Sequence, residues 1–66
     1  MSTAPLEAAD LVVEGLRRRE PAHRPLFLRA LMAHAAAGLA LIEGPAGAGE
    51  AVYRIADAVV SPRRSP

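Results

Sequence analysis

Cysteine is absent from this chain of 66 residues, and so are lysine, asparagine, glutamine and tryptophan. Without cysteine the chain forms no disulfide, and its two histidines, His23 and His34, make a poor zinc set by themselves. A chain of this length buries only about 60% of the surface that its unfolded form exposes, so its folded state is marginally stable. With disulfides and a structural metal excluded, association with another surface is the remaining aid to stability.

Neither sign of charge is in large excess, because the net charge is only +1. The chain as a whole therefore has no strong attraction to nucleic acid or to acidic lipid. Nothing near the N-terminus resembles a signal peptide, since the apolar stretch from Leu6 to Leu16 is interrupted by Glu7, Asp10 and Glu14. We therefore expect a cytoplasmic protein.

Apolar residues recur at spacings of three and four in three segments of the sequence. This pattern predicts helices over about residues 5–19, 25–43 and 48–60. Proline after the first segment and Gly44-Pro45 after the second mark the breaks between them. In the third segment, Glu50 and Arg54 are correctly ordered for an ion pair one helical turn apart.

The second segment differs from its neighbours because it is apolar nearly all round. Its polar side chains are only Arg29, His34 and Glu43, and a helix of this kind is usually a buried one. We predict an all-α, three-helix fold in which this long central helix is flanked by two amphipathic helices and completed by self-association. A single domain is expected over residues 1–61, followed by a disordered basic tail at 62–66.

The stretch GPAGAGEA, residues 44–51, resembles the phosphate-binding loop of P-loop NTPases, whose pattern is GxxxxGK followed by serine or threonine. Gly44 and Gly49 have the spacing of the two framing glycines. However, Glu50 stands where a lysine pairs with the phosphates, and Ala51 stands where a hydroxyl binds magnesium. We therefore predict no nucleotide binding and a helix stop with a flexible connector here, either a relic of such a loop or only a linker.

No residue of the chain is a good candidate for catalysis. His34 has no serine, threonine or cysteine in the core segments to activate, and no metal ligand four residues on. We expect it to be a partly buried histidine satisfied by a neighbour. A three-helix protein of this size has little room for a substrate pocket. The chain is accordingly expected not to be an enzyme and to hold no cofactor and no metal.

Arginines gather around the first break and in the tail, at Arg17, Arg18, Arg19, Arg24, Arg63 and Arg64. Such a patch could bind a phosphate backbone, so a small nucleic-acid-binding regulator is the alternative function. A solvated helix end explains the same residues, and because every basic residue is arginine, codon usage can explain the preference. No aromatic residue lies among these arginines to stack on bases.

A membrane is not an expected partner, since the apolar run from Leu26 to Ile42 is too short to span comfortably and contains Arg29 and His34. What remains is association through helix faces. Once one side of the second helix is covered, its other side leaves a stripe that we take as the candidate interface: Leu26, Ala30, Ala33, Ala37 and Leu41. The sequence thus predicts a non-enzymatic interaction module, an accessory subunit, adaptor, inhibitor or regulator, acting as a homo-oligomer.

Overall fold

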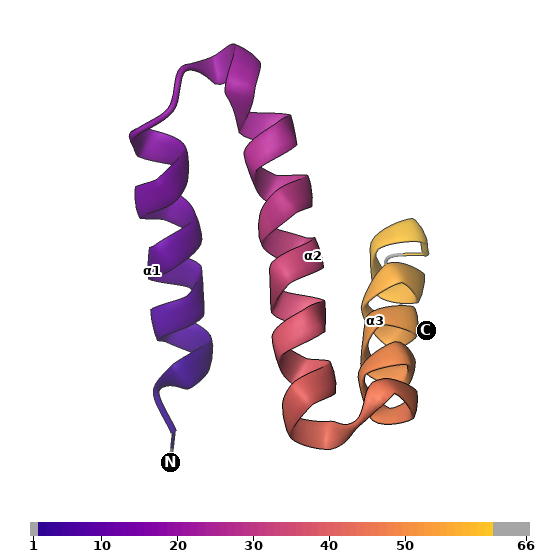
Figure 1. The fold of residues 1–66 in the computed structure, drawn as a ribbon. Coiled ribbons are helices and arrows are strands. Elements are labelled where there is room, and N and C mark those ends of the chain that lie inside the picture. Colours follow the sequence, from indigo (N-terminus) through magenta and orange to yellow (C-terminus); the bar gives the residue numbers. More distant parts are fainter. Residues whose placement is uncertain (1, 62–66) are drawn as a thin grey trace. The chain divides into compact units, whose positions relative to one another are not determined.

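The computed structural model describes residues 2–61, which form three α-helices and one short 3-10 turn (Figure 1). Helix α1 spans Ala4–Arg17, the turn η1 spans Pro21–His23, α2 spans Arg24–Glu43 and α3 spans Pro45–Val60. The structure is 88% helical, with no strand among the described residues. The predicted all-α fold with three helices is confirmed. The predicted disordered tail lies outside the described residues.

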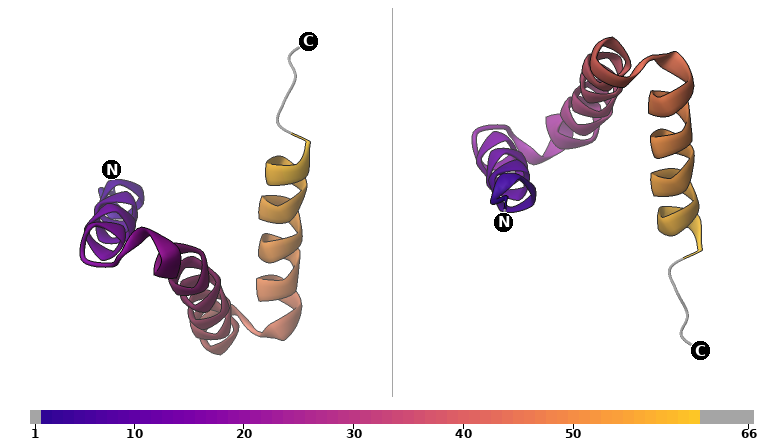
Figure 2. Two further views of the ribbon diagram at one scale, coloured as in Figure 1. Left: turned by 90° about the horizontal axis from the view of Figure 1, so that it is seen from above. Right: turned by 90° about the horizontal axis from the view of Figure 1, so that it is seen from below.

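The chain divides into two compact units, Met1–Leu31 and Met32–Pro66. The first unit holds α1, η1 and the start of α2, and the second holds the rest of α2 together with α3. Only short non-helical links separate consecutive helices, as two further views show (Figure 2). The single domain expected over residues 1–61 stays a prediction.

Helix α1 starts at a polar cap that precedes its apolar stripe. Thr3 is the N-cap residue, and its carbonyl oxygen accepts a hydrogen bond from the Glu7 backbone N–H at 2.9 Å. The Thr3 hydroxyl donates to Glu7 Oε2 at 3.0 Å. The Glu7 carboxylate therefore lies in the first turn, where the positive end of the helix dipole favours it.

The link between α2 and α3 is a single residue, Gly44, with φ +90° and ψ 156°. Side chains with a Cβ rarely adopt this conformation, so glycine is required for the reversal. Pro45 follows as the first residue of α3, where its missing N–H is not needed. The predicted helix stop is correct, but the predicted flexible connector is wrong, because the glycines at 47 and 49 lie inside α3.

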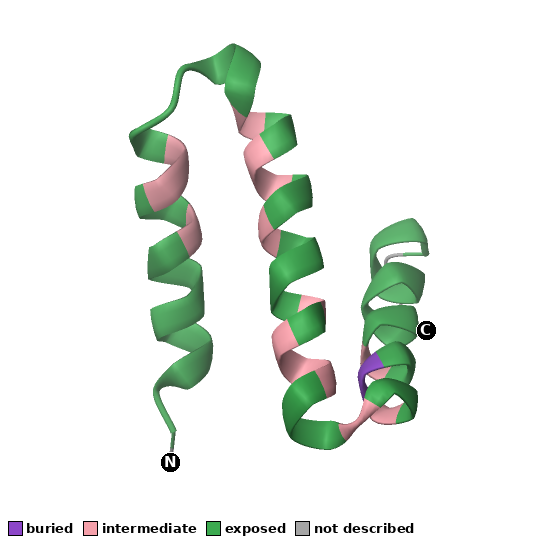
Figure 3. Cartoon of the chain, in the orientation of Figure 1, coloured by how far each residue is buried: buried purple, intermediate pink, exposed green. Residues whose placement is uncertain are grey.

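The buried core of residues 2–61 consists of one side chain, Ala48, which is 4% exposed. Figure 3 shows it as a single purple segment near the start of α3, with most of the ribbon in the green of exposed residues. No residue of α1 or α2 is buried. The single chain thus has regular helices but very little tertiary burial to hold them together.

Candidate association surface

Large apolar side chains are exposed along all three helices. Among residues 2–61, twelve of them are exposed, from 44% at Val52 to 89% at Leu41. The expectation that α2 is a buried helix is therefore wrong for the single chain. Each unit supplies only one other α-helix to cover its share of α2, and one neighbouring helix covers only part of the circumference of another.

The stripe predicted as the interface lies on α2, with all five of its residues exposed: Leu26, Ala30, Ala33, Ala37 and Leu41. Their spacing of four, three, four and four residues places them along one line of the helix. Its two large members, Leu26 and Leu41, are 69% and 89% exposed. The stripe is thus available to a partner, and its role as an interface stays a prediction.

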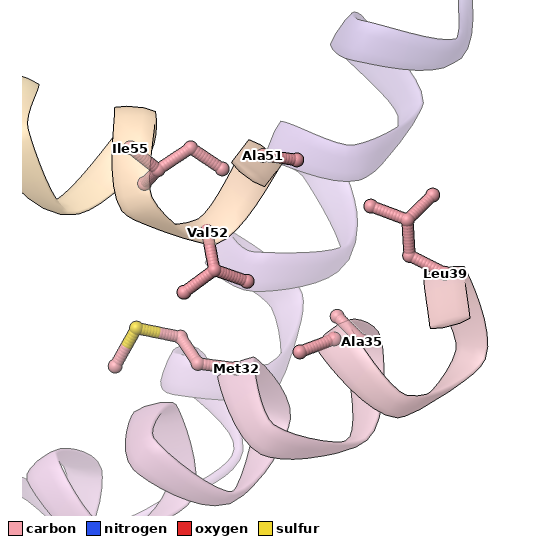
Figure 4. A pocket seen from close by; sticks show the side chains of 7 residues that line it. Met32, Ala35, Leu39, Ala51, Val52 and Ile55 are labelled. Carbon is pink, nitrogen blue, oxygen red and sulfur yellow. The ribbon is translucent and has the colours of Figure 1, made fainter. Parts of the chain in front are cut away.

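A concave apolar surface, which the sequence reasoning did not single out, lies within the second unit. This groove has a volume of about 200 Å³ between α2 and α3, and its lining consists of Met32, Ala35, Ala36, Leu39, Ala51, Val52 and Ile55. Figure 4 shows the side chains of the two helices facing a common space. None of the lining side chains carries a hydrogen-bonding oxygen or nitrogen. The available sequence signal was the apolar stripe of the third helix, which includes Val52 and Ile55.

Two arginines of the predicted basic patch share a carboxylate of their own helix. Arg18 Nε lies 3.3 Å from Glu14 Oε2, and Arg17 Nη1 lies 3.7 Å from Glu14 Oε1. All three side chains are more than half exposed. Ion pairs at such positions contribute about 0–1 kcal/mol. Glu14 also offsets part of the positive charge that a phosphate backbone would meet.

Arg19 and Arg24 of the patch donate to carbonyl groups at the C-terminal end of α1, whereas Arg63 and Arg64 lie outside the described residues. Arg19 Nη1 donates to the Gly15 carbonyl at 2.9 Å. Arg24 Nε donates to the Leu16 carbonyl at 2.9 Å and to the Arg19 carbonyl at 3.2 Å. The last carbonyls of a helix have no partner within it, and guanidinium donors suit the negative end of its dipole. These arginines thus have a structural role as caps.

The same end of α1 holds an aromatic contact. The Arg19 guanidinium lies over the Phe27 ring, 4.0 Å from its centroid, a geometry typical of a cation–π interaction. The ring also lies against Gly15, where a Cβ would come within 2.7 Å of Phe27 Cε2. Gly15 therefore allows α1 and the start of α2 to approach at this point.

The polar residues considered for chemistry are dispersed. His34 is exposed on α2, so its predicted partial burial is wrong. Glu50 forms the predicted pair with Arg54 on α3, at 2.8 Å between Arg54 Nε and Glu50 Oε2. Residues 2–61 contain no group of three or more histidine, aspartate or glutamate side chains arranged to hold a metal ion. The residues of the phosphate-loop resemblance form helix α3 from Pro45 onward and not an open loop.

Residues Pro21–Glu43 form a stretch of 23 residues that is long and apolar enough to cross a membrane, with a mean hydropathy of 1.6 over its most apolar window. It is longer than the run from Leu26 to Ile42 on which the sequence prediction was based. Length and composition are the whole of this signal, and core helices of soluble proteins have them too. The stretch also carries Arg24, Arg29 and His34.

Comparison with known proteins gives no relative from which a function can be transferred. No family model, curated protein or solved structure matches the chain.

Proposed function

We propose that this chain is a non-enzymatic helical interaction module whose folded state is completed by association, in the first place with copies of itself. The observation that carries the proposal is the absence of a buried large apolar side chain among residues 2–61. Full burial of one leucine, isoleucine or valine side chain contributes about 1.5–3 kcal/mol. A second protein surface that covers even a few of the twelve exposed side chains would therefore supply most of the stability that the single chain lacks.

The proposal names apolar faces of α2 and α3 as the binding surface and leaves the biological role at the level of accessory subunit, adaptor, inhibitor or regulator. Exposed apolar surface of this extent marks interaction sites in soluble proteins. Nucleic-acid binding remains the alternative from the sequence, but each arginine of Arg17–Arg19 and Arg24 has a partner in its own chain. No observation in the fold favours that alternative.

Association that completes folding makes helicity depend on protein concentration. We expect the weight-average mass from sedimentation equilibrium and the helical circular dichroism at 222 nm to rise together as the protein is concentrated from nanomolar to millimolar. A fully helical monomer at every concentration would contradict the proposal. Flotation with phosphatidylcholine vesicles serves as the control, because a chain that floats with vesicles and stays monomeric in buffer would assign the apolar surface to a membrane.

A further inference from the structure

We draw no further inference here: the strongest candidate, the apolar groove between α2 and α3 within the second unit, carries nothing because no feature of residues 2–61 shows what covers it.

Discussion

At Gly15, helix propensity and packing against Phe27 predict opposite effects of an alanine substitution on the stability of the fold. Gly15 lies inside α1, where alanine is favoured over glycine by about 1 kcal/mol. Propensity alone therefore predicts that Gly15→Ala stabilises the protein. The structure predicts the reverse, because a Cβ at position 15 would lie 2.7 Å from Phe27 Cε2 and closer still to Cζ.

The size of the expected destabilisation depends on the contacts that the Phe27 ring loses when it moves. Forcing a methyl group into an occupied space costs about 1–3 kcal/mol when neighbours have to move. If the ring moves away, its contact with the Arg19 guanidinium at 4.0 Å is weakened, which costs about 0.5–1 kcal/mol at an exposed site. Against a propensity gain of about 1 kcal/mol, we expect Gly15→Ala to destabilise the fold by about 1–2 kcal/mol.

A double-mutant cycle separates the two contributions. The assay is urea unfolding followed at 222 nm, at one fixed protein concentration because association shifts apparent stability. In a Phe27→Ala background the clash is gone, so adding Gly15→Ala should stabilise the protein by about 1 kcal/mol. Gly15→Ala should therefore lower the free energy of unfolding in the wild-type background and raise it in the Phe27→Ala background. Equal stabilisation by Gly15→Ala with and without Phe27 would refute the close approach of α1 and α2 at this point.

Two further predictions concern the helix links. Gly44→Ala should destabilise the fold by about 1–3 kcal/mol, because position 44 has a φ of +90°. Gly38 lies within α2, and a Cβ added there would meet open space, so Gly38→Ala should stabilise the fold by about 1 kcal/mol. Thermal melts in which both substitutions raise the melting temperature, or both lower it, would contradict this. Arg24→Ala should lower the free energy of unfolding by about 1 kcal/mol, because it removes the hydrogen bonds from Arg24 to the carbonyls at the end of α1. Arg29→Ala on the same helix is the control and should leave the melting temperature unchanged. A neutral Arg24→Ala would show that water replaces the cap.

The helices were predictable because their signals are local. Apolar residues at spacings of three and four, a proline after α1 and Gly44-Pro45 after α2 place all three elements. The start of α3 was predicted at residue 48 and lies at Pro45. The GPAGAG stretch was read as a connector because glycine disfavours helices, but a proline at the first helical position and one glycine at positive φ are enough to begin a helix at once.

The roles of Gly15 and the arginines were not predictable from the sequence, because they depend on contacts across the reversal between α1 and α2. Periodicity assigns Gly15 only a helical cost, and it assigns Arg24 only a positive charge. In the fold, Gly15 makes room for Phe27, and Arg24 reaches back eight residues to the Leu16 carbonyl. Neither partner can be recognised until the reversal at Pro21–His23 has placed the two segments side by side within the first unit.

The sequence predicted that α2 is buried, because it is apolar on nearly every side. An apolar face on every side of a helix indicates the environment that the helix requires, but the chain must also contain enough other surface to supply that environment. Here each unit offers one neighbouring helix, and α2 keeps no buried residue. Much of the hydrophobic free energy that burial of α2 would supply is therefore unused in the single chain. Under the proposed function it becomes available when a second surface covers α2, so we expect the concentration at which this protein folds to be the concentration at which it associates.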